Sequence, residues 1–555
     1  MGADGLRIAI FQMNPTVGDI EGNREAIVEA RRRVPDADLL VCPELCLSGY
    51  PPEDLVLREA YVEACRHSAR LLAEQTTEEK GPALIVGTPW PDDDHPSPRP
   101  FNALLLIDEG EIKAVSRKVR LPNYGPFDEP RTFKPGPALE PVLFRGLNLG
   151  LMVCEDMWFP APASDLKDRG ADLLIVPHGS PFRKTVHGER KFQAEARARE
   201  TGLPVMFVNQ CGGQDELVFD GGSFVLQDDE IAARMPLFRE GLAELVLRRR
   251  GEAWRFERGD LADWEEGDAL IYQALMIGTR DYVRKSGFRD VVLGLSGGID
   301  SALVAAVAAD ALGPEHVHCV RLPSRYTSEG SMSDAEELAE LLGLRLDTVP
   351  IEPAVDAIGG MLNDVFAGRL ADLTEENLQS RIRGTTLMAI SNKLGSLMLT
   401  TGNKSEMAVG YATLYGDMNG AYNPLKDVYK TRVFSLCRWR NAHRPEGGLG
   451  PEGCVIPEAI IAKPPSAELR DNQRDDDSLP PYDVLDDILR GFVEDEASVA
   501  TIVGRGHDET MVRRVQTMLY RAEYKRRQSA PGPKISTKYF GRDRRYPIVN
   551  RYNEG

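Results

Sequence analysis

The sequence predicts an α/β protein with two large domains. Three observations lead to this prediction: a length of 555 residues, short apolar runs that alternate with helical patterns, and a charged interval that interrupts this alternation. Because single hydrophobic cores stop growing near about 250–300 residues, a chain of this length is expected to form two of them. We expect one domain at 1–250, a linker at 251–267 and a second domain at 268–555.

In the first domain, short runs rich in Val, Ile and Leu predict buried strands. They lie at 7–13, 38–42, 83–89, 102–108, 147–154, 172–177 and 204–210. Amphipathic patterns at 18–33 and 52–75 predict helices between several of these strands. The alternation predicts a layered α/β domain with its functional groups at strand ends.

The alternation of apolar runs with helical patterns stops at 251–267, where charged residues dominate, and this change predicts the linker. The second domain then opens with a predicted helix, strand, glycine turn, helix and strand. These elements lie at 269–287, 290–295, 296–301, 302–312 and 316–323. Such a βαβ beginning predicts a parallel sheet with a loop that faces a ligand.

Composition and charge exclude several classes of protein. Apolar content of 42% with 28% charged residues is ordinary for a soluble protein, and no window has the ~20 apolar residues of a membrane span. The net charge of −19 disfavours nucleic acid as a partner, because binding to phosphates needs a basic surface. Eight scattered cysteines, without metal-binding spacing, suit a reducing compartment. We expect a cytoplasmic protein with small-molecule partners and no membrane or nucleic acid.

The glycine turn Ser296-Gly-Gly-Ile-Asp-Ser301 lies between a predicted strand and helix. Its glycines let successive backbone N–H groups converge at a helix N-terminus, which forms a phosphate site. The Walker A lysine is missing, and this favours pyrophosphate binding over γ-phosphoryl transfer. Asp300 would be repelled by phosphates unless a divalent cation, most economically Mg²⁺, lay between them. Glu406 is the candidate second ligand, and its alternative interpretation is an acid at a helix N-terminus.

The second domain resembles the NAD synthetases of the ATP-pyrophosphatase class. The resemblance lies in SGGIDS, ENLQSRIRGT, TGNKSEMAVGYATLYGD, AKPPSAELR and YKRRQSAPGPKI, and it spans most of 285–540. It implies a Rossmann-like parallel-sheet domain that uses ATP and Mg²⁺. The implied ATP contacts are Gly294, Leu295, Ser296, Gly297, Gly298, Ile299, Asp300, Ser301, Arg383, Thr401 and Ser466. The implied deamido-NAD contacts are Asn377, Glu406, Tyr411, Asp417 and Lys525. The implied metal ligands are Asp300 and Glu406. Further implied phosphate contacts are Lys426 and Lys534. The segment LPSRYTS should shape the nucleotide walls, but Arg325 and Ser328 have no separate roles assigned.

In the first domain, Cys154 ends a strand pattern and enters a turn, which is where a nucleophile belongs. A buried structural cysteine is the alternative interpretation. Glu44 and Lys118 follow other predicted strands, and the three strand ends could converge. A carboxylate can accept the thiol proton, and an ammonium can stabilise an oxyanion.

The segments CPELCLSGYPPEDL, KVRLPNYGPFDEPRTF, VCEDMW, HGSPF and VNQCGGQDELVFDGGSFV resemble the nitrilase-superfamily glutaminase domain that is fused to NAD synthetases. They cover nearly all of 7–240. The resemblance implies an αββα sandwich with Glu44 as base, Lys118 as oxyanion support and Cys154 as nucleophile. Glu129 is a further acidic partner. The implied glutamine contacts are Tyr50, Tyr124, Phe127, Ser180 and Arg190, with Lys184 and Lys191 as rivals for the α-carboxylate.

Together the resemblances imply glutamine-dependent synthesis of NAD from deamido-NAD and ATP, with ammonia moving through a tunnel in a homo-oligomer. The alternative is a stand-alone amidase whose second domain only senses nucleotides. The intact glycine turn and the two carboxylates, Asp300 and Glu406, disfavour that alternative.

Overall fold

The computed structural model describes residues 5–94, 97–471 and 473–552. The chain divides into a unit that ends at Glu265 and a unit that begins at Glu266, and each is described by itself. Part of the segment that we expected to be a linker is instead a strand, β15 (Ala253–Phe256), which pairs with β14 (Gly241–Arg250). Trp254 and Phe256 are buried and alternate with more exposed residues, so a short period-2 pattern was hidden among the charges.

The first unit contains two large sheets. The seven-stranded sheet has the order β15-β14-β1-β2-β3-β4-β5, and the six-stranded sheet has the order β13-β12-β9-β8-β7-β6. The remaining strands of the first sheet are β1 (Gly5–Gln12), β2 (Leu39–Val41), β3 (Ala83–Trp90), β4 (Phe101–Asp108) and β5 (Glu111–Arg117). Those of the second are β6 (Val142–Phe144), β7 (Leu147–Leu151), β8 (Leu173–His178), β9 (Val205–Asn209), β12 (Phe224–Gln227) and β13 (Glu230–Arg234), while β10 (Cys211–Gln214) and β11 (Leu217–Asp220) form a separate hairpin.

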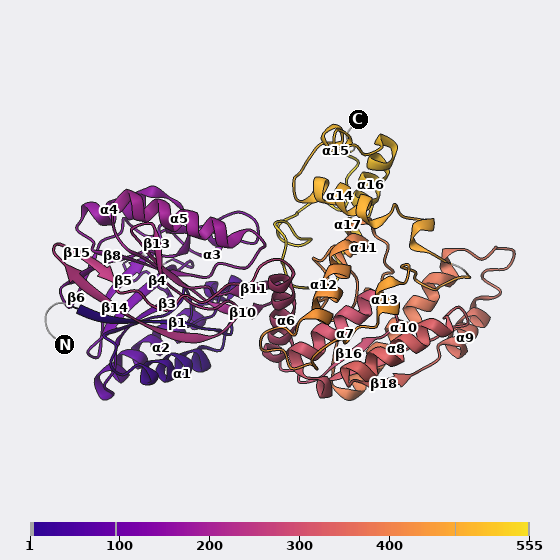
Figure 1. Ribbon diagram of the computed structural model, residues 1–555, viewed down its shortest axis with the longest axis horizontal. Helices are drawn as coiled ribbons and strands as arrows, with labels where there is room; N and C mark the ends of the chain where they lie inside the picture. Colours follow the sequence, from indigo (N-terminus) through magenta and orange to yellow (C-terminus); the bar gives the residue numbers. More distant parts are fainter. Residues whose placement is uncertain (1–4, 95–96, 472, 553–555) are drawn as a thin grey trace. The chain divides into compact units, whose positions relative to one another are not determined.

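Side-chain alternation along the strands builds the layers of this unit. Val41 of β2 packs in the core shared with Leu149 and Ile175 of the second sheet, whereas Leu40 packs with the helices on the other side. Figure 1 shows α1 (Ile20–Arg33) and α2 (Glu59–Glu78) on one side of the sheets, and α4 (Pro160–Asp168) and α5 (Val186–Thr201) on the other. The predicted αββα sandwich is confirmed, and the short α3 (Glu129–Thr132) lies among its loops.

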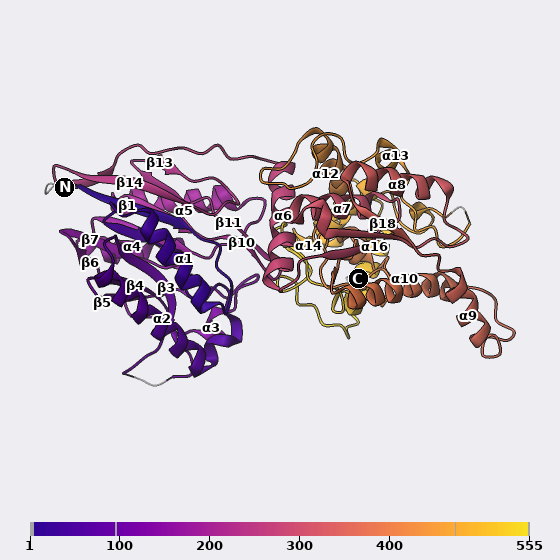
Figure 2. The same cartoon turned by 90° about the horizontal axis from the view of Figure 1, so that it is seen from below.

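The second unit is built on a four-stranded parallel sheet with the order β18-β17-β16-β19. The strands are β16 (Val291–Gly294), β17 (Val317–Arg321), β18 (Arg345–Thr348) and β19 (Leu397–Met398). The helices are α6 (Asp268–Lys285), α7 (Ile299–Leu312), α8 (Glu329–Leu342), α9 (Glu352–Leu362), α10 (Leu373–Leu394), α11 (Lys404–Val409), α12 (Lys430–Ala442), α13 (Glu458–Ala462), α14 (Tyr482–Val493), α15 (Val499–Val503), α16 (Glu509–Arg521) and α17 (Glu523–Arg526). This arrangement confirms the predicted Rossmann-like class, and Figure 2 shows α9 beside the outer end of α10.

One predicted helix, at 52–75, is interrupted. A 3₁₀ helix at Glu53–Leu57 comes first, Arg58 is extended, and α2 begins only at Glu59. Val56 is buried in a cluster with Tyr50 and Phe219, so tertiary packing overrides the continuous helical pattern. Among the described residues, no helix combines the length and apolar character that crossing a membrane requires.

Candidate functional site

Cys154 occupies a sharp turn at the end of a strand. After β7 ends at Leu151, Cys154 begins a 3₁₀ helix with a φ of +44°, in the left-handed region that L-residues avoid. The Asp156 carboxylate holds this turn, because it accepts the Val153 N–H at 3.1 Å and the Arg120 N–H at 2.7 Å. The strained turn thereby fixes the thiol beside the segment that carries Lys118.

Glu44 and Lys118 meet in a fully buried ion pair. Lys118 Nζ donates to Glu44 Oε1 at 2.7 Å and to Glu129 Oε1 at 2.9 Å. Asn102 Nδ2 also donates to Glu44 Oε1 at 2.7 Å, and the Gly179 N–H donates to Glu44 Oε2 at 2.7 Å. The three donors to Glu44 come from separate segments of the chain, and together they fix the orientation of its carboxylate.

The charges around Cys154 define its chemical state. Burial raises the pKa of the Cys154 thiol well above its usual range, the Glu44 carboxylate raises it further, and Lys118 opposes the shift. Burial opposes the charge on Lys118, but the carboxylates of Glu129 and Glu44 outweigh it and hold the pKa of Lys118 high. Burial, partly offset by Lys118, raises the pKa of Glu129 to about 7. The thiol is therefore protonated near neutral pH, and its attack on a carbonyl needs a base.

Several predicted glutamine contacts surround this centre. Tyr50 Oη donates to Glu129 Oε1 at 3.2 Å, and Tyr124 Oη donates to Glu155 Oε2 at 2.8 Å. The rings of Tyr124 and Phe127 meet edge to face, with centroids 5.5 Å apart. Tyr50, Phe127 and Glu129 line a small cavity of about 30 Å³. The triad and these aromatic residues thus belong to one region of the first unit.

Arg190, the predicted ligand of the glutamine α-carboxylate, is buried behind Ser180. Its Nη1 pairs with Asp220 at 2.9 Å, its Nε donates to Ser180 Oγ at 3.0 Å, and its Nη2 donates to the Ser180 carbonyl at 2.6 Å. All three guanidinium nitrogens therefore have protein acceptors. Lys184 is exposed, and Lys191 pairs with Glu195 at 3.3 Å. In this structure Arg190 holds Ser180, and direct contact with glutamine stays a prediction.

The predicted phosphate loop follows β16 and leads into α7. Gly297 has a φ of +77°, and a Cβ built there would lie 2.3 Å from the Ser331 carbonyl oxygen, so neither its conformation nor its space admits a side chain. The Gly298 N–H donates to Ser296 Oγ at 3.2 Å, and Ser301 Oγ donates to the Gly298 carbonyl at 3.0 Å. The turn is thus fixed at the N-terminus of a 14-residue helix, where an anion is favoured.

Asp300 and Glu406 converge on a lysine that sequence reasoning missed. Lys430 Nζ donates to Asp300 Oδ2, and it lies 3.4 Å from Glu406 Oε1. Asn403 Nδ2 donates to Asp300 Oδ1 at 3.0 Å. Burial raises the pKa of Glu406 to about 8, although Lys430 opposes the shift. Glu406 also completes a capping box with Asn403 at the start of α11, which fits the alternative interpretation of Glu406 as a helix N-terminal acid.

These carboxylates suit a magnesium ion that is shared with substrate. Mg²⁺ is usually held by one or two carboxylates together with phosphate oxygens and water. Among the described residues, no group of three or more His, Cys, Asp and Glu side chains is arranged to hold a metal. Asp300 and Glu406 have the chemistry of such ligands, and a Mg²⁺ site at these two carboxylates stays a prediction.

The residues predicted to contact deamido-NAD gather around the segment 410–417. Thr413 Oγ1 donates to Asn377 Oδ1 at 2.9 Å, and the Thr413 N–H donates to Asp417 Oδ1 at 2.7 Å. Lys525 Nζ donates to the carbonyls of Gly410 at 2.7 Å and Ala412 at 2.6 Å. The structure thus brings Asn377, Asp417 and Lys525 together from distant parts of the chain. Tyr411 lies in the segment 410–417 that they contact.

The other predicted nucleotide contacts lie in several segments of the second unit. Arg383 Nε donates to the Leu322 carbonyl at 3.0 Å, and Ser466 Oγ donates to the Gln473 carbonyl at 2.6 Å. Thr401 lies shortly after β19, and Lys534 forms a buried ion pair with Asp543. Their contacts with ATP stay predictions.

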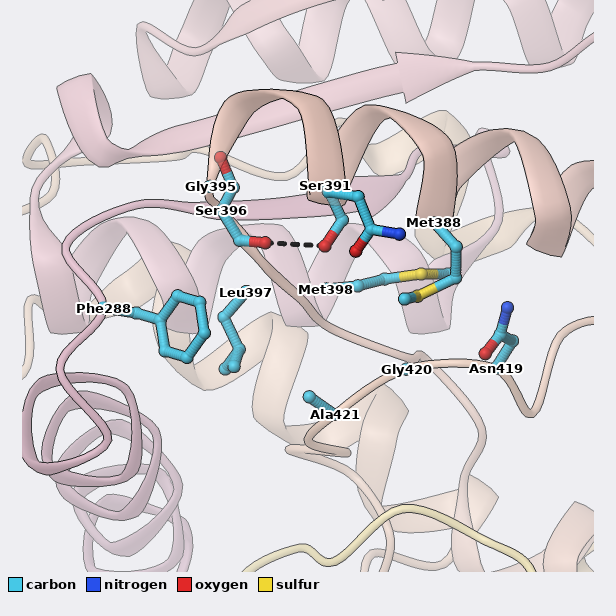
Figure 3. A pocket seen from close by; sticks show the side chains of 11 residues that line it. Phe288, Met388, Ser391, Gly395, Ser396, Leu397, Met398, Asn419, Gly420 and Ala421 are labelled. Carbon is cyan, nitrogen blue, oxygen red and sulfur yellow. Dashed lines mark hydrogen bonds between the residues drawn. The ribbon is translucent and has the colours of Figure 1, made fainter.

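A separate cavity of about 390 Å³ lies beside the C-terminal part of α10 (Figure 3). Met388, Met398 and Phe288 contribute apolar surface, and Ser391 Oγ donates to the Ser396 carbonyl at 2.7 Å. The residues predicted to contact ATP or deamido-NAD are not among those that line it. The cavity is therefore distinct from the candidate nucleotide site.

Comparisons with known proteins match both units. The carbon-nitrogen hydrolase family model matches residues 7–255, and the NAD synthase model matches residues 271–529. Glutamine-dependent NAD(+) synthetase from Rhodobacter capsulatus is 50% identical, and the alignment covers 99% of each chain. The enzyme of the same name from Xanthomonas campestris is 46% identical, with 99% of this chain and 98% of that protein covered. A solved glutamine-dependent NAD+ synthetase from Acinetobacter baumannii, in complex with ADP, is 40% identical, with a TM-score of 0.77 and coverage of 98% of this chain and 99% of that chain.

Proposed function

The chain belongs to the glutamine-dependent NAD(+) synthetase family, and from this premise we propose how its residues divide the reaction. Glu44, Lys118 and Cys154 release ammonia from glutamine. The phosphate loop, Asp300 and Glu406 act where ATP activates deamido-NAD. We assign the glutaminase to the first unit, which includes β15 and ends at Glu265, and the ammonia ligase to the second unit, which begins at Glu266.

In the glutaminase centre, Glu44 accepts the Cys154 proton as sulfur attacks the glutamine amide carbon. Lys118 stabilises the negative charge that develops on the amide oxygen. The C–N bond then breaks, the leaving nitrogen takes a proton, and ammonia departs from a thioester. Water, deprotonated by Glu44, cleaves the thioester to glutamate and regenerates the thiol. The buried ion pair supports these roles, because Lys118 donates directly to Glu44.

In the ligase centre, the pyridine carboxylate of deamido-NAD attacks the α-phosphorus of ATP, and pyrophosphate leaves. Backbone N–H groups of the phosphate loop and the Lys430 ammonium hold the phosphates. Asp300 and Glu406 would hold Mg²⁺, which neutralises phosphate charge when it is bound. Ammonia then attacks the acyl carbon, AMP departs, and NAD forms. An enclosed path for ammonia suits this chemistry, because ammonium is a poor nucleophile.

We further propose that the protein works in the cytoplasm as a homo-oligomer. All eight cysteines lie within the described residues and are free, which suits a reducing compartment. Large α/β enzymes are commonly symmetric homo-oligomers. Measurement of the mass of the protein in solution tests whether this chain forms one.

One observation carries the proposed function: two complete constellations occur in one chain, each within the matching family region. The test is mass-resolved product analysis with ATP, Mg²⁺, deamido-NAD and glutamine labelled with ¹⁵N in its amide. We expect equimolar AMP, pyrophosphate, glutamate and ¹⁵N-labelled NAD. Release of glutamate and ammonia without NAD or AMP would instead support the stand-alone amidase, which the NAD synthase match already disfavours.

A further inference from the structure

The segment 463–471 lies beside the predicted phosphate site and is fastened by one carboxylate. Glu468 Oε1 accepts Ser331 Oγ at 2.7 Å and Ser328 Oγ at 2.9 Å, and Oε2 accepts the Ser328 N–H at 3.3 Å. Lys463 Nζ, from the same segment, donates to Ser331 Oγ. Ser328 and Ser331 lie 132–140 positions away in sequence from Lys463 and Glu468, so these bonds join distant parts of the unit.

The residues that Glu468 contacts lie against the phosphate loop. Ser328 is the N-cap of α8, and Ser331 is buried in its first turn. The Ser331 carbonyl is the atom that leaves no space for a side chain at Gly297. A displacement of this turn would therefore be transmitted directly to the loop that is proposed to hold phosphates.

Two further features show that Glu468 is held in a defined position. Its φ is +48°, a left-handed conformation that persists in a non-glycine residue only where surrounding contacts impose it. The next residue, Leu469, presents its carbonyl to Gln379 Nε2 at 3.0 Å, on the helix that also carries Arg383. The charge of Glu468 partly offsets the burial that lowers the pKa of Arg383 to about 10, which places the carboxylate near another predicted ATP contact.

We propose that Glu468 is a positioning residue. Its hydrogen bonds to Ser328 and Ser331, which we call the clasp, hold segment 463–471 closed beside the phosphate loop while the acyl-adenylate exists. The same segment carries Ser466, a predicted ATP contact. This inference rests on the proposed ligase reaction and assigns Ser328 a role, as half of the clasp. Opening of the segment admits water, which attacks the acyl carbon of the adenylate. The acyl–oxygen bond to phosphate then breaks, and AMP and deamido-NAD form instead of AMP and NAD.

The test compares Glu468→Gln with Asp471→Asn in the full-length protein. Asp471 is an exposed acid on the same segment, and it lies outside the proposed clasp. With ATP, Mg²⁺, deamido-NAD and ammonium, the unaltered protein should give AMP and NAD in a 1:1 ratio. Glu468→Gln should give excess AMP, and in H₂¹⁸O the recovered deamido-NAD should carry label in its carboxylate. Asp471→Asn should keep the 1:1 ratio.

Hydrogen exchange keeps the inference testable if Glu468→Gln makes little product. Backbone amides of 463–471 should exchange about tenfold faster or more in Glu468→Gln with ATP bound, which corresponds to ~1.4 kcal/mol. Ser331→Ala should produce the same excess AMP, and adding it to Glu468→Gln should have little further effect. Unchanged exchange and a 1:1 product ratio in Glu468→Gln would overturn the clasp, as would equal uncoupling by Asp471→Asn. Failure of the unaltered protein to form AMP and NAD would instead overturn the ligase reaction.

Discussion

Substitution of Glu44 by Gln tests the glutaminase mechanism most sharply, because it removes the base and keeps the shape of the side chain. Glu44 accepts hydrogen bonds from Lys118 and Asn102 on one oxygen and from the Gly179 N–H on the other. An amide has one acceptor oxygen, so in either orientation at least one of these buried donors faces an NH₂ group. We expect a loss of ~1–3 kcal/mol in the free energy of unfolding of the first unit.

The loss in catalysis should be larger. General-base catalysis contributes about 10²–10⁴-fold, or ~2.7–5.4 kcal/mol of barrier at ~1.36 kcal/mol per factor of ten. Because burial and Glu44 raise the pKa of Cys154, the thiol depends on a base for its deprotonation. Glutamate release should therefore fall by about 10²-fold or more, while NAD synthesis from ammonium salts continues.

The assay follows glutamate release and ammonium-dependent NAD synthesis in parallel. Glu74→Gln, an exposed position on α2, is the matched control and should change neither. Glutamate release by Glu44→Gln within about threefold of the unaltered protein would refute the role of Glu44 as base. Equal loss of ammonium-dependent synthesis would show that the substitution had disturbed more than the glutaminase centre.

Three further predictions follow from the same geometry. Because burial and Glu44 raise the pKa of Cys154, its alkylation by iodoacetamide should keep accelerating above pH 9, and a plateau below pH 7 would show a preformed thiolate. Asp300→Asn should abolish NAD synthesis from both nitrogen sources while glutaminase turnover continues, and continued release of AMP would contradict the proposed metal role. Asp310→Asn breaks a fully buried ion pair with Arg440, so it should lower the free energy of unfolding of the second unit by ~3–5 kcal/mol in a urea titration. Glu452→Gln, in an exposed pair with Arg444, should cost less than about 1 kcal/mol, and equal costs would argue against burial as the cause.

The sequence predicts the layers well where strands are buried and helices are amphipathic. The run at 83–89 became β3 (Ala83–Trp90), and the pattern at 18–33 became α1 (Ile20–Arg33). The strand in the expected linker was missed because only Trp254 and Phe256 carry its apolar face. The 3₁₀ turn before α2 was missed because it depends on Val56 packing against residues far away in the chain.

Motifs point to reactive residues but not to those that hold them in place. Lys430 lies outside the segments quoted from the sequence, and it meets Asp300 across 130 positions of sequence. Asn102 and Asp156 were given no role, since an amide that orients a carboxylate and a carboxylate that holds a turn leave no periodic signal. Nothing in the sequence indicated that Arg190, the predicted glutamine ligand, pairs with Asp220 and holds Ser180, and its contact with glutamine stays a prediction.

The division of nitrogen release and nitrogen transfer between two centres is tested most directly by Cys154→Ala. NAD formation by this variant should be measured at saturating ATP, Mg²⁺ and deamido-NAD, once with glutamine and once with an ammonium salt. We predict no NAD above background with glutamine and a near-normal rate with ammonium. Equal loss with both nitrogen sources, or continued synthesis from glutamine, would contradict the account.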